Sequence, residues 1–360
     1  MANTDSTFHK ELEIKTNMQL RELMKDLPDS VSDYMRAIAT STSPLTRLAY
    51  GYDLRIFFHF LTTERLEFSG RKPKELTIDD MARLTLKDIE VYQEYLATYV
   101  KPTFDEDEQP RENPDYVINE ELGISRKLSA LRSFYKYLYT HEYIPENVTE
   151  KIRMPKIKEK PVIYLDRNEV AKMLDTISTG EGLSSRQQKF VEHSRVRDLA
   201  MIMLLVGTGI RESELVGMDI SDVDLDEEAF VVTRKGGNQM ILYFNDNIRD
   251  ALGDYMAIRE GIEPLPGHEQ ALFLSSQRRR ITTRAVQNLV KKYATVAAPL
   301  KRKLSPHKLR STYATTLYRN TGDIYQVSKT LGHKNVSTTK RYTQESEDSN
   351  RQASKHVDWV

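Results

Sequence analysis

A short segment rich in proline and lysine, residues 154–163, divides this sequence into two parts. It carries two prolines, high charge and no apolar periodicity, which is typical of a linker between domains. The parts on either side, residues 1–153 and 164–345, are each long enough to bury a core of their own. The sequence therefore predicts two domains, followed by a polar tail at residues 346–360 that ends with the sole tryptophan, Trp359.

The first part, residues 1–153, is predicted to be helical. Asp29 is a candidate cap for one helix, and Ser43 followed by Pro44 begins the clearest one, because serine suits the N-cap and proline the first helical position. Apolar residues continue at helical spacing to Leu61. Further helices are expected over residues 86–100 and 125–141, separated by an acidic loop that contains proline over residues 101–118.

The second part predicts helices around a small β-hairpin. Asp166 caps a helix that runs to Ile177, a polar loop is expected over residues 179–194, and a buried helix over 196–206 ends at Gly207 and Gly209. Two short β-type runs flank a turn that contains glycine, and helices are expected to follow. The strands are predicted over 229–233 and 240–244, and the helices over 246–260, 283–297, 305–318 and 324–331. The fold class is therefore mainly α with a small sheet.

Charge is balanced over the whole chain but not along it. The chain holds 53 basic and 53 acidic residues, yet residues 271–341 contain sixteen Lys and Arg against the single acid Asp323, a local balance of +15. Such a segment can neutralise phosphates, which points to nucleic acid. The absence of cysteine excludes disulfides, thiolate metal sites and a cysteine nucleophile. No membrane span or secretory signal is visible, so a cytoplasmic protein is expected.

The run from Ser305 to Arg310 places two functional side chains at a helix start. His307 and Arg310 are three residues apart, so they share a face, and they lie in the first turn, where free N–H groups favour an anion. A phosphate cradle is one interpretation, and a surface His beside a surface Arg is the other.

Two further motifs lie earlier in the chain, one before the expected hairpin and one at its tip. Arg211 comes two residues after Gly209, and Glu214 lies three residues further on, where it could hold the guanidinium by a bidentate contact or form an ordinary structural ion pair. Lys235 lies at the expected hairpin tip, from which a flexible ammonium can reach a reaction centre or simply aid solubility.

The last motif pairs His333, presented by a turn at Gly332, with Tyr342 nine residues later. Ser337 is expected to cap the short helix that carries Tyr342. A phenol with a pKa near 10 needs neighbouring cations and a base to act as a nucleophile, and Lys340 and Arg341 adjoin it. Taken alone, Tyr342 is one of nineteen tyrosines and would be interpreted as a packed residue.

Together these motifs resemble the ordered signature of the tyrosine recombinase (integrase) family. TGIRESEL, the hairpin lysine, PHKLR, LGH and the final tyrosine occur in the family's order over residues 165–345. The segments SPLTRLAYGYDLRIFFHFL and ISRKLSALRSFYKYL are similar to helices of its core-binding domain. The resemblance implies a helical core-binding domain and a catalytic domain that form a C-shaped clamp on DNA. Residues 101–121 and 179–194 depart from compact members of the family.

The resemblance also implies roles for these residues. Tyr342 would attack the scissile phosphate to form a 3′-phosphotyrosyl link, and Arg211 and Arg310 would bind the non-bridging oxygens. Lys235 would protonate the 5′-oxygen that leaves, and His307 would move the tyrosine proton. The other expected contacts are a hydrogen bond from His333 to the phosphate, support from Glu214, and DNA contacts from Arg47, Arg126, Lys127 and Arg132. Neither a metal nor a cofactor is implied.

The implied partners are duplex DNA with a specific recombination site and further copies of the chain. Four copies would join two duplexes and exchange strands through a Holliday junction, with the tail docking on a neighbouring subunit and an accessory protein left open. The absence of an arm-binding domain favours an Xer-like recombinase over a phage integrase that uses accessory sites. A mobile-element integrase, a type IB topoisomerase and a catalytically silent DNA-binding regulator are the alternatives.

Overall fold

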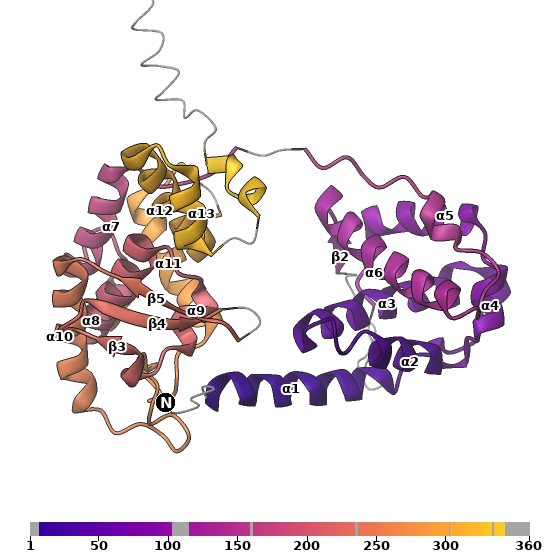
Figure 1. Cartoon of the computed structure of the whole chain (residues 1–360), viewed down its shortest axis with the longest axis horizontal. Coiled ribbons are helices and arrows are strands. Elements are labelled where there is room, and N and C mark those ends of the chain that lie inside the picture. Colours follow the sequence, from indigo (N-terminus) through magenta and orange to yellow (C-terminus); the bar gives the residue numbers. More distant parts are fainter. Residues whose placement is uncertain are drawn as a thin grey trace, which may run out of the picture. The chain divides into compact units, whose positions relative to one another are not determined.

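The computed structural model describes residues 7–102, 115–158, 161–234, 237–301, 303–332 and 335–342. The chain separates into two compact units, Met1–Glu159 and Lys160–Val360, and each is described by itself (Figure 1). The division falls inside the segment 154–163. The prediction of a mainly helical fold with small sheets is confirmed. Within the described ranges, no helix combines the length and the apolar character needed to cross a membrane.

The first unit is a bundle of helices with one short hairpin. The predicted cap at Ser43 is present, because its hydroxyl accepts the backbone N–H of Thr46. Asp29 does not cap α2. It is the first residue of that helix, and Pro28 precedes it. The helices are α1 (Thr7–Met24), α2 (Asp29–Ala37), α3 (Pro44–Glu64), α4 (Ile78–Arg83), α5 (Leu86–Ala97) and α6 (Glu121–Thr140), with 3-10 turns at Leu66–Phe68, Pro73–Glu75 and Val148–Lys151.

Two short strands lie at the borders of the loop expected over residues 101–118. The strands β1 (Thr98–Val100) and β2 (Tyr116–Ile118) pair antiparallel, with Tyr99 opposite Val117. The predicted helix over 86–100 therefore ends three residues early, at Ala97. The acidic part of this insert, residues 103–114, lies outside the described residues.

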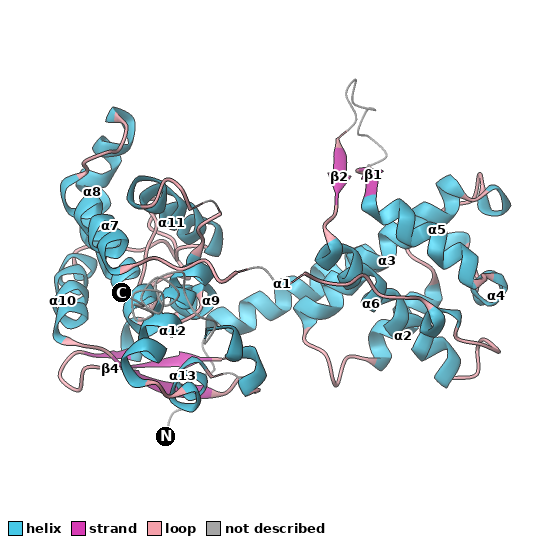
Figure 2. Ribbon diagram, turned by 90° about the horizontal axis from the view of Figure 1, so that it is seen from above, coloured by secondary structure: helices cyan, strands magenta, loops and turns pink. Residues whose placement is uncertain are grey.

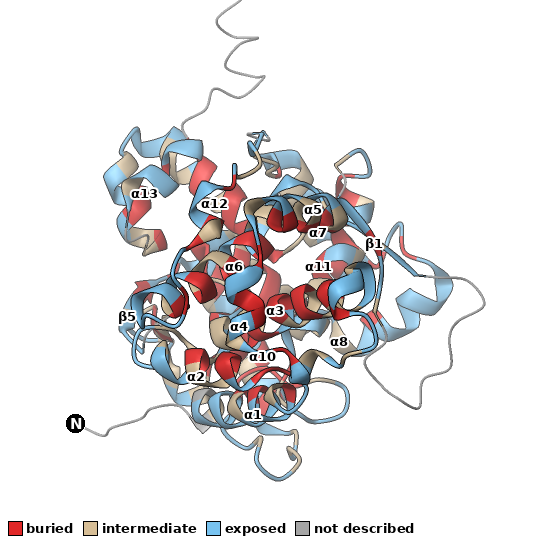
Figure 3. Ribbon diagram, turned by 90° about the vertical axis from the view of Figure 1, so that its right-hand side faces the viewer, coloured by how far each residue is buried: buried red, intermediate tan, exposed pale blue. Residues whose placement is uncertain are grey.

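Helices α3 and α6 form the centre of the first core, and buried residues line both helices in Figure 3. Aromatic rings fill much of the space between α3 and its neighbours. Phe57 and Tyr92 meet edge to face with their centroids 5.0 Å apart, and Phe58 meets Phe134 in the same way at 6.1 Å. Such rings bury a large apolar area each, which stabilises the unit.

The second unit surrounds helix α8 (Ser185–Thr208), which packs against α7, α10 and α12. An antiparallel sheet of order β3-β4-β5 pairs Val231 with Ile241, and Figure 2 shows it along one margin of the unit. The helices are α7 (Arg167–Thr179), α9 (Glu212–Gly217), α10 (Asp246–Glu260), α11 (Thr283–Ala297), α12 (Pro306–Thr321) and α13 (Ile324–Leu331). The strands are β3 (Val223–Asp224), β4 (Ala229–Thr233) and β5 (Gln239–Tyr243), and 3-10 turns occupy Ile220–Asp222, Val336–Thr338 and Lys340–Tyr342.

Helix α8 corrects one expectation and bears out another. The polar loop predicted over residues 179–194 is wrong, because only the residues between Thr179 and Ser185 are non-helical. A capping box starts α8: the Ser184 hydroxyl accepts the Gln187 N–H, and the Gln187 side chain accepts the Ser184 N–H. At the other end the helix stops as predicted, because Gly209 takes a left-handed conformation with φ +65°.

Candidate active site

Arg211 follows Gly209 at the end of α8 and is fixed by Glu214. The Glu214 carboxylate accepts the Arg211 backbone N–H at 2.9 Å with one oxygen and the Arg211 Nη1 at 2.6 Å with the other. Only 3% of the Glu214 side chain is exposed, against 37% for Arg211. The buried carboxylate therefore holds a guanidinium that remains partly exposed. The expected bidentate contact with the guanidinium differs from what is found, because one carboxylate oxygen takes the backbone N–H instead.

Arg310 lies in the first turns of α12 and is 2% exposed. Its Nη1 donates to the Gly209 carbonyl at 2.5 Å, and its Nη2 donates to the Leu331 carbonyl. These two carbonyls belong to the ends of α8 and α13, where the backbone leaves acceptors unpaired and the helix dipole is negative. Arg310 therefore joins the ends of three helices at one point.

Tyr342 packs on the same helices. It belongs to a buried cluster with Ala314, Val327 and Leu331, and 3% of it is exposed. The cap predicted at Ser337 is wrong. Asn335 caps the preceding turn instead, because its side chain accepts the Ser337 N–H. The asparagine takes this role because its side-chain amide oxygen reaches an N–H two residues on.

Arg341 connects the predicted nucleophile to the predicted proton carrier. Its Nη2 donates to the Tyr342 hydroxyl oxygen at 2.7 Å and lies 3.2 Å from Nε2 of His307. A cation that donates to a phenol oxygen stabilises the phenolate form more than the neutral form. Arg341 adjoins Tyr342 in the sequence, but its contact with His307 could not be predicted from that position.

Burial and neighbouring cations together set the electrostatics of the site. Burial, followed by the nearby Arg211, lowers the pKa of Arg310 to about 10. The pKa of His307 is also lowered, first by partial desolvation of the ring and then by the positive charges of Arg341 and Lys308. In both groups burial is the larger cause, and the neighbouring cations, whose charge a phosphate would neutralise, act in the same direction.

Two predicted site residues, Lys235 and His333, lie outside the described residues. The residues that flank them are described. Arg234 and Gly237 bound the hairpin turn, and Gly332 ends α13 in a left-handed conformation with φ +61°. The contact of Arg234 with α13 was not predicted, because nothing in the local sequence distinguishes this arginine from the lysine beside it.

The N-terminal cations predicted to contact DNA have different surroundings. Lys127 does not face outward as expected: it is 6% exposed, and its Nζ donates to Asn119 Oδ1 at 2.9 Å. Arg132 donates to the backbone carbonyls of residues 149, 150 and 152, and so ties α6 to the following turn. Arg47 donates to Asn17 at 3.2 Å. Arg126 pairs with buried Asp53 but keeps 52% of its side chain exposed.

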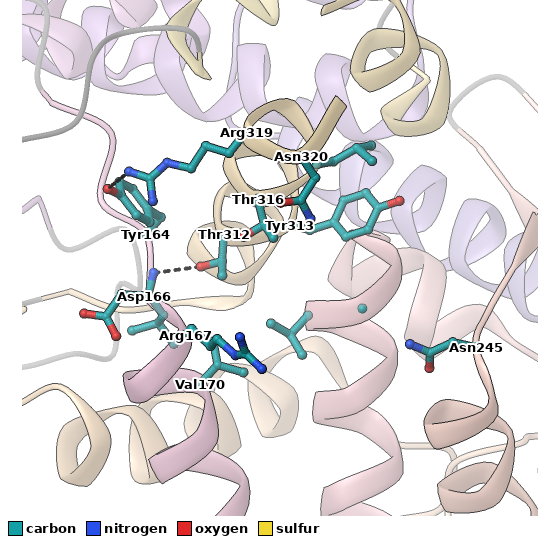
Figure 4. Close-up of a pocket in the computed structure, with 14 residues that line it drawn as sticks. Tyr164, Asp166, Arg167, Val170, Asn245, Thr312, Tyr313, Thr316, Arg319 and Asn320 are labelled. Carbon is teal, nitrogen blue, oxygen red and sulfur yellow. Dashed lines mark hydrogen bonds between the residues drawn. The ribbon is translucent and has the colours of Figure 1, made fainter. Parts of the chain in front are cut away.

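A separate hollow of about 680 Å³ lies between α7 and α12 (Figure 4). Tyr164 and Arg319 border it, with Arg319 Nη2 donating to the Tyr164 hydroxyl at 2.7 Å. Its lining residues do not include Arg211, Arg310 or Tyr342. The candidate site therefore lies outside this hollow, where the ends of α8 and α13 meet the start of α12.

Arginines gathered around a tyrosine hydroxyl and a histidine fit one class of protein, an enzyme that transfers a phosphoryl group to its own tyrosine. The comparisons define the family. The sequence model of the phage integrase family matches residues 164–349, which is more than half of the chain. The chain therefore belongs to the phage integrase family and is a tyrosine recombinase, an enzyme that cleaves and rejoins DNA strands at specific sites.

Curated relatives agree over almost the whole length. The chain is 34% identical over 328 residues to tyrosine recombinase XerC of Caldanaerobacter subterraneus subsp. tengcongensis, covering 88% of this chain and 83% of the relative. It is 31% identical over 350 residues to tyrosine recombinase XerS of Streptococcus agalactiae serotype III, covering 90% and 94%.

Solved structures share the fold at lower identity. XerH recombinase bound to a palindromic difH substrate matches with a TM-score of 0.61 at 19% identity, covering 86% of this chain and 78% of that one. A lambda integrase tetramer bound to a Holliday junction matches with a TM-score of 0.58 at 16% identity, covering 87% and 76%. At these identities the likeness concerns the fold alone.

Proposed function

We propose that Tyr342 attacks the scissile phosphate while Arg211 and Arg310 bind its non-bridging oxygens. The observation that carries this proposal is the buried Arg310, held by two helix-end carbonyls beside Arg211, with its pKa lowered to about 10. Backbone carbonyls carry only partial charge, so these two contacts do not neutralise the guanidinium of Arg310. A phosphorane-like transition state, with its greater negative charge, fits this place better than the ground state does.

In the cleavage step one bond forms and one breaks. The Tyr342 oxygen bonds to phosphorus, and the bond between phosphorus and the 5′-oxygen breaks. His307 takes the tyrosine proton, and Lys235 gives a proton to the departing 5′-oxygen. Arg341 stabilises the forming phenolate through its 2.7 Å contact, and His333 donates a hydrogen bond to the phosphate. The phosphotyrosine conserves the energy of the bond, so attack by a 5′-hydroxyl reverses the step.

The substrate we propose is a specific duplex site bound by several copies of the chain. Four copies would pair two duplexes and exchange strands through a Holliday junction, as the tetrameric form of a structural neighbour supports. The half-exposed Arg126 is the N-terminal cation best placed to contact a phosphate. Lys127 is buried, so we do not include it among the proposed DNA contacts. The tail at 346–360, expected to dock on a neighbouring copy, lies outside the described residues.

We further propose an Xer-like role, in which the enzyme resolves chromosome dimers. Similarity to XerS over 94% of that relative's length supports this role over that of a mobile-element integrase. The relatives named as recombinases do not favour a topoisomerase or a catalytically silent regulator.

The decisive test is covalent capture. Wild-type protein incubated with fragmented DNA of its source organism should become linked to a discrete sequence, which sequencing of the trapped fragments would locate. A nicked duplex carrying that sequence should then give a covalent adduct with wild type and none with Tyr342→Phe. Tyr313→Phe, a partly buried tyrosine on α12, is the matched control and should form the adduct. An adduct that persists in Tyr342→Phe would refute the nucleophile.

A further inference from the structure

Arg234, at the end of β4, makes contacts that join the hairpin to α13. Its Nη2 donates to the Thr330 carbonyl at 2.9 Å, and its Nη1 donates to the Leu331 carbonyl. Helix α13 leaves these last carbonyls without helical partners, so a forked guanidinium satisfies them. The Leu331 carbonyl also accepts from Arg310, so one oxygen receives donors from both the hairpin and α12.

The backbone of Arg234 also closes the turn that carries Lys235. The Arg234 N–H donates to the Asn238 carbonyl at 2.8 Å, and the Arg234 carbonyl accepts the Gly237 N–H at 3.0 Å. The turn is therefore fixed at its base by the same residue whose side chain is anchored on α13.

The fit around the Arg234 guanidinium is close. A Cβ added to Gly332 would lie 2.6 Å from Cζ of Arg234, and Gly332 has φ +61°, so glycine is needed there on both counts. Arg234 Nε is buried without a hydrogen-bond partner in the described part of the chain. Burial lowers the pKa of this arginine, while the nearby Glu214 carboxylate acts in the opposite direction.

We propose that Arg234 is a positioning residue that holds the Lys235 turn against the end of α13, so that the lysine reaches the 5′-oxygen. This inference rests on the proposed function of Lys235 as the general acid. The anchor works without contact between Arg234 and DNA. It sets the lysine relative to Arg310, because both arginines share the Leu331 carbonyl.

The test compares two substrates that differ at the leaving atom. One is the nicked duplex with an ordinary phosphodiester. The other carries a 5′-bridging phosphorothiolate, whose sulfur leaves as a thiolate and needs no proton. Arg234→Ala should slow single-turnover cleavage of the first about a hundredfold, as expected for a misplaced catalytic group. It should cleave the second at a rate within about threefold of wild type, because the acid is then dispensable.

Two variants and one control separate positioning from folding. Arg234→Lys keeps the charge but cannot fork between two carbonyls, so it should show the same selective defect in a smaller amount. Arg249→Ala removes an arginine that pairs with Glu228 at 2.8 Å at the opposite end of the sheet, and should cleave both substrates like wild type. Thermal unfolding of each variant checks that the unit is folded.

The outcomes distinguish this inference from the proposed function. If Lys235→Ala is rescued by the phosphorothiolate and Arg234→Ala is not, Arg234 does not act through the lysine and the inference is overturned alone. If Lys235→Ala is not rescued, the lysine is not the acid and both fall. Equal loss on the two substrates for Arg234→Ala, or no loss on either, also overturns the positioning role.

Discussion

Helix α8 bears one charged cluster near its middle and another just beyond its C-terminal end, and the two clusters are built differently. Near the middle, buried Asp198 accepts from Tyr293 at 2.8 Å, from Lys292 at 3.2 Å and from Arg197 at 2.7 Å. At its last turn, Glu214 pairs with Arg211, whereas the described partners of Arg310 are helix carbonyls. The residues 198 and 209 are separated by roughly 16 Å along the helix.

The difference separates a structural network from a binding site. Asp198 gives a full carboxylate partner to both cations beside it, Arg197 and Lys292. Near Arg310 the Glu214 carboxylate pairs with Arg211, while Arg310 itself donates to carbonyls, and burial first and then Arg211 lower the pKa of Arg310. Buried charge without a full counter-ion costs stability, and such a cost is retained where a ligand supplies the missing charge.

The largest effect is expected from Arg310→Ala. Removal of one donor to the transition state should lower the single-turnover cleavage rate about a thousandfold. Thermal unfolding should also show a loss of stability, because the Gly209 and Leu331 carbonyls lose their donor. Arg259→Ala is the matched control: Arg259 is 4% exposed and also donates to backbone carbonyls, those of residues 262, 269 and 271. It should lose a similar amount of stability and keep its cleavage rate, and an equal loss of cleavage in both variants would contradict the comparison.

Asp198→Ala tests the cluster near the middle of α8. It leaves the partly exposed Lys292 and Arg197 without their anion, so the free energy of unfolding should fall by about 3 kcal/mol. Cleavage by the protein that remains folded should match wild type, measured well below the unfolding midpoint. A large loss of cleavage in folded Asp198→Ala would mean that the two clusters are functionally coupled.

Sequence patterns predicted what depends on local chemistry. The end of α8 at Gly209 and the start of α12 at Pro306 follow from backbone conformations that few residues adopt. The first half of α8 was missed because its serines and glutamines resemble a loop. The capping box at Ser184 and Gln187 was the available signal.

The orientation of Lys127 was missed for a related reason. It lies four residues before Leu131 and seven before Phe134, so it occupies the apolar stripe of α6 although it is charged. The order of motifs predicted which residues gather at the site. It could not predict that Arg234 and Arg310 share one carbonyl, because backbone acceptors are the same at every position and only the tertiary fold selects among them.

The smallest predicted effect concerns the two histidines whose pKa values are lowered for different reasons. Burial alone lowers the pKa of His59 in the first unit, whereas His307 is affected by desolvation and then by Arg341 and Lys308. A lowered pKa means that the neutral ring persists below pH 6.5, its ordinary value. If neutral His307 takes the tyrosine proton, the cleavage rate should stay level down to pH 6.5 and decline only below it.

Salt should distinguish the two histidines, because counter-ions screen charges but do not reverse burial. Raising the ionic strength from about 0.1 M to about 1 M shortens the screening length from about 10 Å to about 3 Å. In an NMR titration the pKa of His307 should then rise toward 6.5, while that of His59 should hardly move. Lys308→Met should produce a smaller rise at low salt. If the pKa of His307 changes with neither salt nor Lys308→Met, neighbouring cations do not lower it. The contrast between this site and the cluster around Asp198 would then be wrong.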